Sequence, residues 1–272
     1  MEEVSGDIPK EEKIHKLTRL LKSYGSAVIA YSGGTDSTLL TYLVKQALGV
    51  NHLAVTATSP TYTGEELKNA KAIAMRFGFN HAMVTTDELD DPQFAANPLD
   101  RCYHCKQHLF KIIGAMALQK GIKTILDGTN ADDAHDFRPG RKAAQEWGVI
   151  SPFAEAGLNK AEIRRLAKAK GLPNWNKPAN ACLASRIPFG TKIDPETLAK
   201  IEKGELFLAK LGIKKCRVRH HGDIARIEVP PRDFNKVVTR KAEIVKGISE
   251  AGYKFITLDL AGYQMGCFNP KR

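Results

Sequence analysis

The sequence predicts an α/β protein with a doubly wound, mainly parallel sheet and a smaller α+β domain at its C-terminal end. Two patterns in the 272 residues lead to this expectation. Over the first part, apolar runs of strand length alternate with helical patterns, which is typical of a parallel sheet covered by helices on both faces. The last part has strands of alternating polarity beside helices. We expect two domains, over residues 1–190 and 191–272.

The first domain is expected to begin with a helix over residues 10–23, where apolar side chains recur at helical spacing. Strands and helices then alternate. The strands are expected at 27–31, 52–57, 81–85 and 122–126, and the helices between them at 36–48, 64–77 and 103–119. A further helix over 159–170 carries its own start signal, because Asn159 can cap it and Glu162 can complete a capping box.

An irregular stretch over residues 173–188 follows, and it is too long for a simple connector. The chain beyond it predicts one helix and then a β-β-α-β unit. These elements are expected at 195–210 for the first helix, 217–220 and 224–229 for two strands, 233–249 for the second helix and 254–260 for the last strand.

Composition and charge limit the class of protein. A hydrophobic content of 43% with 26% charged residues is typical of a soluble globular chain. The sequence has no apolar run of about 18 residues that could span a membrane, and its acidic, polar start differs from a secretion signal. We therefore expect a cytoplasmic protein. Of the net charge of +11, residues 199–272 carry +8, which favours an anionic partner, either a phosphorylated small molecule or a nucleic acid.

A glycine-rich segment, SGGTDS over residues 32–37, stands between the first strand and the helix that follows it. Its glycines let the main chain approach an anion closely, and its hydroxyls and the N–H groups that open the helix can donate to phosphate oxygens. Asp36 is an acid beside such a site, which indicates a bridging Mg²⁺. The Walker pattern is absent from the sequence, so ordinary phosphoryl transfer is not indicated. The alternative interpretation is a plain glycine-rich turn.

Two other loops follow strands of the same predicted sheet, at residues 58–60 and 127–130. Ligands of such sheets bind at the carboxyl ends of the strands, so we expect all three loops to meet at one edge. The sequence therefore predicts a nucleotide site there. Its candidate binding residues are Ser32, Gly33, Gly34, Asp36, Ser37 and Gly128.

Three of the five cysteines are candidates for chemistry. An odd number of cysteines in an expected cytoplasmic chain argues against a disulfide framework. Cys102 and Cys105 stand three residues apart at the start of a predicted helix, on one face, and the helix terminus lowers their pKa. Cys182 lies in the irregular stretch, 77 residues beyond Cys105.

If these three thiolates meet, they suit a [4Fe–4S] cluster with one iron left open. A fourth protein ligand, His104 or His220, favours tetrahedral zinc instead. Catalytic thiols without a metal and unrelated structural cysteines are the remaining interpretations. Cys216 and Cys267 have apolar surroundings and are expected to be small core residues.

Six segments, spread over nearly the whole chain, carry a resemblance to a known family. They are SGGTDS, RCYHCK (101–106), LDGTNADD (126–133), DFRPGRKA (136–143), NWNKPANACLASR (174–186) and RVRHHGDIARIEVP (217–230). Together they resemble the LarE family, ATP-dependent pyridinium-3,5-biscarboxylate mononucleotide sulfurtransferases of the PP-loop ATP pyrophosphatase superfamily. The resemblance implies an adenine nucleotide alpha-hydrolase-like fold for the first domain.

The resemblance also implies a reaction. A pyridinium carboxylate attacks the α-phosphate of ATP, pyrophosphate leaves, and sulfur then displaces AMP to give a thiocarboxylate for nickel-pincer cofactor synthesis. ATP, Mg²⁺ and a [4Fe–4S] cluster are the implied cofactors, and sulfide or another sulfur donor is an implied partner. Family members form oligomers, so self-association is expected.

The family contains two chemistries. In one type, a single cysteine in the segment NWNKxAxC gives up its sulfur, but this chain has Ala181 at that position and Cys182 beside it. That type also lacks cysteines at the places of Cys102 and Cys105. The chain resembles the other type, in which three cysteines hold a cluster whose open iron carries an extra sulfide.

Basic residues of the last part are candidates for substrate binding. Arg217 and Arg219 are two residues apart on a predicted strand, so both side chains emerge on one face and can grip a phosphate bidentately. The resemblance adds Ser185 and Arg186 to the neighbourhood of the substrate or of the phosphates, and it matches Glu205 to an acidic position. The alternative for each charge is a solvated surface side chain.

Three other functions compete with sulfur transfer to a small molecule. A cluster-dependent tRNA thiolase of the same superfamily fits the basic C-terminal part, but the sequence has neither zinc-ribbon cysteines nor a recognisable RNA-binding module, so we do not expect nucleic acid as a partner. An amidating ligase of the NAD or GMP synthetase type leaves the three cysteines unexplained. The third is a binding protein that holds ATP without cleaving it.

Overall fold

The computed structural model describes residues 11–135, 139–178, 181–264 and Phe268. The chain divides into two compact units. Unit 1 consists of Met1–Ser59, Gly64–Asp87 and Cys102–Asn180, and unit 2 of Pro60–Thr63, Glu88–Arg101 and Ala181–Arg272. Two short segments from the first 101 residues thus pack with the C-terminal part rather than with their sequence neighbours.

Unit 1 is built on a four-stranded parallel sheet with the order β3-β2-β1-β4. The strands are β1 (Ala27–Ala30), β2 (His52–Thr58), β3 (His81–Thr85) and β4 (Ile125–Leu126). The central strands β1 and β2 are buried along nearly their whole length, as expected for strands covered on both faces. This confirms the predicted α/β class.

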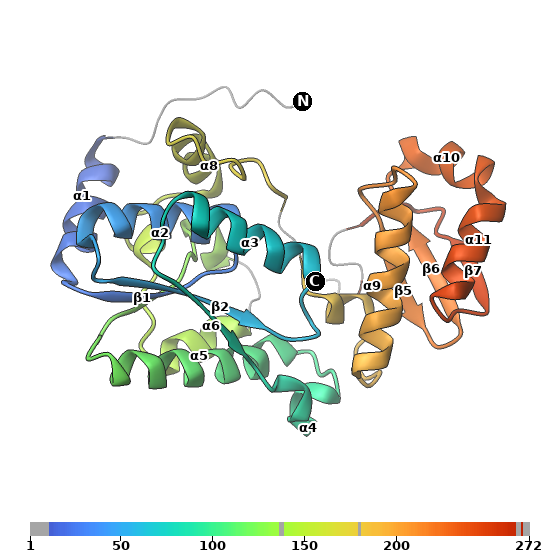
Figure 1. Cartoon of the computed structure of the whole chain (residues 1–272), viewed down its shortest axis with the longest axis horizontal. Coiled ribbons are helices and arrows are strands. Elements are labelled where there is room, and N and C mark those ends of the chain that lie inside the picture. The colour runs from blue at the N-terminus through green and yellow to red at the C-terminus, as the bar shows by residue number, and fades with distance from the viewer. Residues whose placement is uncertain (1–10, 136–138, 179–180, 265–267, 269–272) are drawn as a thin grey trace. The chain divides into compact units, whose positions relative to one another are not determined.

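Helices cover both faces of this sheet (Figure 1), α2 and α3 lying on one side and α5 and α6 on the other. The longer helices of unit 1 are α1 (Glu11–Ser23), α2 (Thr35–Leu48), α3 (Gly64–Arg76), α5 (Arg101–Gln119), α6 (Gly140–Glu146) and α8 (Lys160–Ala169). Alternate residues of β1 supply the two apolar layers. Ile29 packs with α1, α2 and α8, whereas Val28 packs with α5 and α6.

Local sequence signals set the ends of several helices. At the start of α8, the side chain of Asn159 accepts from the Glu162 N–H and the Glu162 carboxylate accepts from the Asn159 N–H, which is the predicted capping box. Strand β4 is shorter than expected, because the Ile122 N–H donates to the Ala117 carbonyl and so closes the end of α5 instead of entering the sheet.

Unit 2 contains a three-stranded sheet with the order β5-β6-β7, in which β5 and β6 are antiparallel and β6 and β7 parallel. Its strands are β5 (Arg217–His221), β6 (Ile224–Glu228) and β7 (Phe255–Leu258), and its longer helices are α9 (Pro195–Lys210), α10 (Phe234–Thr239) and α11 (Lys241–Glu250). One face of the sheet, with Val218, Ala225 and Ile227, packs against these helices in a second apolar core. The other face carries the arginines of β5 and β6.

The single helix expected over 233–249 is divided into α10 and α11 at Arg240. The run Val237–Thr239 is β-branched and disfavours a continuous helix. The Thr239 hydroxyl donates to carbonyls of α10, and the Arg240 guanidinium donates to the Leu211 carbonyl and pairs with Glu243. These hydrogen bonds stabilise the break between α10 and α11.

The remaining elements are short. They are η1 (Glu88–Asp90), α4 (Pro92–Ala95), η2 (Ala131–His135), α7 (Pro152–Glu155), η3 (Leu183–Arg186) and η4 (Pro231–Asp233). Across the part of the chain that the structure describes, no helix is both long and apolar enough to cross a membrane.

Candidate functional site

The SGGTDS segment comprises the turn after β1 and the first residues of α2, and hydrogen bonds link its two ends. The Ser32 and Ser37 hydroxyl oxygens lie 3.0 Å apart, and the Ser32 N–H donates to the Ser37 hydroxyl. Gly33 has φ +69°, and a Cβ there would lie 2.6 Å from the Cβ of Ala70 on α3. Both the backbone conformation and the close approach of α3 therefore require glycine.

Asp36 lies in the first turn of α2 and is largely buried. One of its oxygens, Oδ2, accepts from the Lys160 ammonium at the start of α8. The other, Oδ1, is buried with no hydrogen-bond partner among the described residues. Burial raises the pKa of Asp36, and Lys160 opposes that rise. A buried carboxylate oxygen with spare acceptor capacity fits a Mg²⁺ ligand.

The loop after β4 lies against the same turn. A Cβ at Gly128 would lie 3.0 Å from the Ser37 nitrogen and 3.2 Å from the Asp36 Cβ, so a side chain there would crowd the start of α2. The neighbouring Asp127 is buried, accepts from the Ser151 hydroxyl at 2.7 Å and lies 3.5 Å from the Lys106 ammonium. The structure thus brings Gly128 together with residues 32–37, as the sequence predicts.

Two residues of this site are not among the predicted ones. Lys160 directly follows the capping Asn159, but its contact with Asp36 joins residues 124 positions apart and has no local sequence signal. Asn174 is 8% exposed, and its side-chain amide donates to the Gly33 carbonyl at 3.0 Å and to the Thr38 hydroxyl at 2.9 Å. The main-chain carbonyl of Asn174 accepts from the Thr35 hydroxyl at 2.7 Å. The segment after α8 therefore holds three residues of the loop and the first turn of α2, a contact across about 140 positions of sequence.

Two of the three candidate cysteines lie on α5 of unit 1. Cys102 is exposed and Cys105 is partly buried, one turn further along the helix. Cys182 belongs to unit 2, so the meeting of all three stays a prediction. Within the described ranges, no group of three His, Cys, Asp or Glu side chains is close enough to hold a metal ion.

Cys182 begins a tight turn, η3, whose main chain is held by side chains of unit 2. The Arg186 guanidinium is 1% exposed and donates to the carbonyls of Ala181 and Cys182. It also forms two bonds of 2.9 Å with the Glu205 carboxylate on α9. The Cys182 side chain itself is partly exposed.

The arginines of β5 are on one face of the small sheet, as predicted, but their surroundings differ. Arg219 is 4% exposed, pairs with Glu228 at 2.8 Å and donates to the Ser185 carbonyl at 2.9 Å. Arg217 is partly exposed and lies over the Tyr263 ring. Arg226 is opposite Arg219 in register and shares Glu228 with it.

Of the two remaining cysteines, one lies in a core and the other lies outside the described residues. Cys216 is buried, as predicted, whereas Cys267 and residues 136–138 of the DFRPGRKA motif are outside the described residues. His220 is also buried, and its ring contacts Tyr253.

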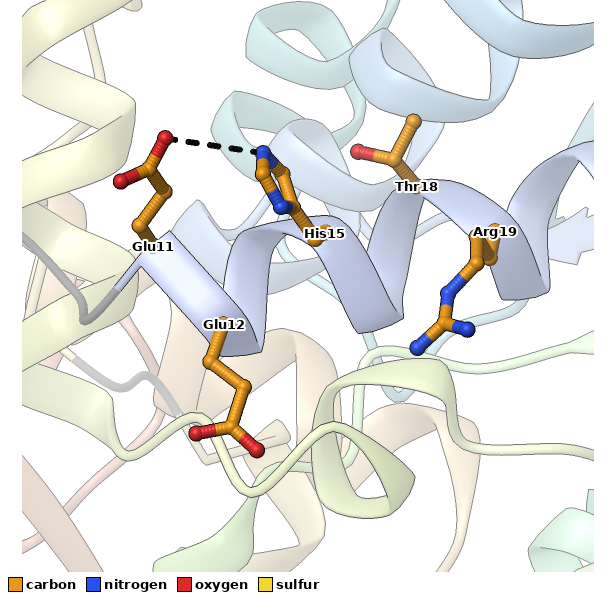
Figure 2. Close-up of a pocket in the computed structure, with 5 residues that line it drawn as sticks. All are labelled: Glu11, Glu12, His15, Thr18 and Arg19. Atoms are coloured by element: carbon orange, nitrogen blue, oxygen red, sulfur yellow. Dashed lines mark ion pairs between the residues drawn. The ribbon is translucent and has the colours of Figure 1, made fainter.

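A pocket lies along exposed residues of α1, and Figure 2 shows the side chains that line it. Its lining residues are Glu11, Glu12, His15, Thr18 and Arg19, and Glu11 pairs with His15 at 3.7 Å. All five come from one exposed helix face. The candidate site is therefore placed at the SGGTDS loop, where groups from several elements converge.

Comparisons with known proteins agree with these features. The family model described as NAD synthase matches residues 11–97, which contain the SGGTDS loop. An uncharacterized protein of Synechocystis is 41% identical over 95% of this chain and 97% of its own length. An uncharacterized protein of Methanocaldococcus jannaschii is 32% identical over 87% of this chain and 90% of its own length.

A relative with a described activity covers almost the whole chain. The pyridinium-3,5-bisthiocarboxylic acid mononucleotide synthase of Lactiplantibacillus plantarum is 35% identical over 254 residues, which are 93% of this chain and 92% of that protein. Identity at this level extends through both units. The chain belongs to the LarE family of PP-loop proteins and is an ATP-dependent enzyme.

Proposed function

We propose that the protein adenylates a carboxylate of a pyridinium mononucleotide with ATP and converts it to a thiocarboxylate. The family relationship supports sulfur transfer to a substrate of this kind. The observation that carries the proposal is the partly buried Asp36 carboxylate, whose Oδ1 is buried without a hydrogen-bond partner among the described residues, beside Gly128 and the SGGTDS turn. It combines a cation ligand with a phosphate-binding loop at the end of β1.

In this proposal the loop binds the pyrophosphate end of ATP. The N–H groups at the start of α2 and the hydroxyls of Ser32 and Ser37 donate to phosphate oxygens. Asp36 would hold Mg²⁺, which would offset the charge on the pyrophosphate. The Lys160 ammonium lies at the Asp36 carboxylate. In this proposal it leaves that carboxylate and binds the phosphates of ATP.

Adenylation itself needs positioning more than acid–base chemistry, since a carboxylate is already a nucleophile. Holding the carboxylate and the α-phosphate in line replaces an encounter in solution, and effective molarities for such arrangements reach about 10⁵–10⁸ M. Arg217, which is partly exposed on β5, is the residue we assign to the phosphate of the mononucleotide, with Arg219 and Ser185 beside it.

For the sulfur step we propose that Cys102, Cys105 and Cys182 act together as ligands of a [4Fe–4S] cluster. Thiolates are the ligands that such clusters take, and the first two lie one helical turn apart with Cys102 exposed. When bound, the cluster supplies the sulfide that displaces AMP. Anaerobic reconstitution should then give about four irons per chain and broad visible absorption. A colourless protein with full activity would exclude this donor.

The test of the function is pyrophosphate release, measured separately with several acceptors. We expect release with ATP and pyridinium-3,5-biscarboxylate mononucleotide, followed by a thiolated product when sulfide is present. Release with unmodified tRNA would favour the tRNA thiolase. An amidating ligase would release pyrophosphate only with ammonia and with its own carboxylate or nucleotide acceptor. Pyrophosphate release under those conditions would favour that class. If the protein binds ATP but releases no pyrophosphate with any acceptor, it would be a nucleotide-binding protein rather than an enzyme of these classes.

A further inference from the structure

The turn that carries Cys182 is built around a buried guanidinium. All three nitrogens of Arg186 are engaged. Its Nη1 donates to the carbonyls of Ala181 and Cys182 and to the Ser185 hydroxyl, while Nε and Nη2 donate to the two oxygens of Glu205 at 2.9 Å each. With 1% of its surface exposed, this guanidinium contacts its own turn rather than solvent.

Glu205 connects the turn to the rigid part of unit 2. It lies on α9, and besides Arg186 its Oε1 accepts from the Val218 N–H of β5 at 3.1 Å. Val218 belongs to the apolar core of unit 2. A chain of bonds therefore runs from the carbonyl of Cys182 through Arg186 and Glu205 to the sheet.

Two further bonds fix the same turn from other directions. The Leu183 N–H donates to the Thr61 carbonyl at 2.8 Å, and Arg219 donates to the Ser185 carbonyl at 2.9 Å. Leu183 and Ala184, which belong to the turn, are buried. The main chain on the C-terminal side of Cys182 is thus held at several points, whereas the Cys182 side chain remains partly exposed.

We propose that Arg186 and Glu205 are positioning residues that hold the main chain of Cys182 and so present its thiol in one place. The family resemblance brings both side chains near the substrate, but a substrate anion could reach Arg186 only by displacing a carboxylate and two carbonyls that already neutralise and bind it. The chemical consequence of this role rests on the proposed function. The geometry of the turn does not.

The first test measures thiol reactivity, which needs no substrate. In a background with Cys102, Cys105 and Cys267 replaced by Ala, we compare alkylation of Cys182 by iodoacetamide with and without Glu205→Gln. The neutral amide keeps the size of Glu205 but loses the ion pair, so the turn opens more often and alkylation should accelerate about fivefold or more. Glu196→Gln is the matched control, because Glu196 is an exposed residue of the same helix that pairs with Lys200. It should leave the rate unchanged.

Arg186→Lys is a second variant in case Glu205→Gln fails to fold. It keeps the positive charge but loses the planar fork that reaches two carbonyls and a carboxylate at once. Alkylation of Cys182 should again accelerate. Unchanged alkylation in folded Glu205→Gln and Arg186→Lys, as judged by far-UV circular dichroism, would overturn the positioning role.

The second test separates positioning from substrate binding in the chain with all its cysteines. In Glu205→Gln the KM for the pyridinium mononucleotide in pyrophosphate release should stay within about twofold, while thiolated product falls at least about tenfold. A tenfold higher KM with unchanged alkylation would make these residues substrate ligands instead. If the unmodified protein releases no pyrophosphate, the proposed function fails, but the alkylation result still decides the positioning role.

Discussion

At the scale of single residues, side chains of the same chemical type have different roles in different surroundings. Asp36 combines partial burial, one lysine partner and one oxygen with no hydrogen-bond partner among the described residues, which suits a cation ligand. Glu228 is also a carboxylate, but it is buried and pairs with both Arg219 and Arg226. Cys182 is partly exposed, whereas Cys216 is buried in the core of unit 2. Surroundings rather than identity therefore separate reactive groups from structural ones.

Replacing Asp36 should stop the first half-reaction. Asp36→Asn keeps the shape of the side chain but removes the charge that holds Mg²⁺, so we expect pyrophosphate release to fall by at least about 100-fold. Far-UV circular dichroism should stay unchanged. Asp223→Asn is a useful control, because Asp223 is an exposed residue of unit 2 that pairs with Lys254. Release within tenfold of the unmodified rate in Asp36→Asn would contradict this role.

The thiols should differ in their response to pH. Burial, with the Glu205 carboxylate nearby, raises the pKa of Cys216 to about 12. A thiol with a raised pKa stays protonated until the pH approaches that value, so Cys216 should remain unmodified by iodoacetamide at pH 8 in the folded protein. The exposed Cys102 should be modified under the same conditions. Peptide mass spectrometry measures both, and equal modification of the two would show that Cys216 is not buried as described.

At the scale of elements, the phosphate-binding loop depends on a segment far away in the sequence. The turn between β1 and α2 is held from one side by α3, which contacts Gly33, and from the other by Asn174. Gly128, from the loop after β4, completes the contact with the first turn of α2. The loop is therefore preorganised by three elements, which is what a site for a transient charge requires.

Removing the Asn174 amide should affect the loop more than the fold. Asn174→Ala leaves the Gly33 carbonyl and the Thr38 hydroxyl without this donor, at a cost of about 1–3 kcal/mol in unfolding free energy. Because the loop loses its tether, the KM for ATP in pyrophosphate release should rise about tenfold. Val44→Ala, in the core side of α2, is the control that lowers stability without touching the loop. Equal KM values in the two variants would assign Asn174 a structural role only.

Several elements could be predicted because their signals are local. The SGGTDS turn, the capping box of α8 and the alternation of strands and helices each depend on residues close in sequence. The contacts of Asn174 and the burial of Arg186 could not be predicted, because both depend on partners brought together by the fold. An arginine is also exposed by default, so only its carboxylate and carbonyl partners explain its burial.

At the scale of the whole molecule, the proposed reaction uses residues of both units. Unit 1 holds the nucleotide loop with Asp36 and Lys160 as well as Cys102 and Cys105, and unit 2 holds the Cys182 turn and the arginines of β5. Each unit has its own apolar core. The excess of positive charge in the last 74 residues suits the binding of an anionic mononucleotide by unit 2. Activation and sulfur transfer should therefore be separable by mutation.

The most direct test of this account measures pyrophosphate release and thiocarboxylate formation in one reaction mixture, for the unmodified protein and for Cys182→Ser. With ATP, Mg²⁺, sulfide and the pyridinium mononucleotide, the unmodified protein should form both products. Cys182→Ser should still release pyrophosphate, because the nucleotide loop of unit 1 is intact, but should form no thiocarboxylate. Thiocarboxylate at the normal rate from Cys182→Ser would contradict the account, and so would the absence of pyrophosphate release from the unmodified protein.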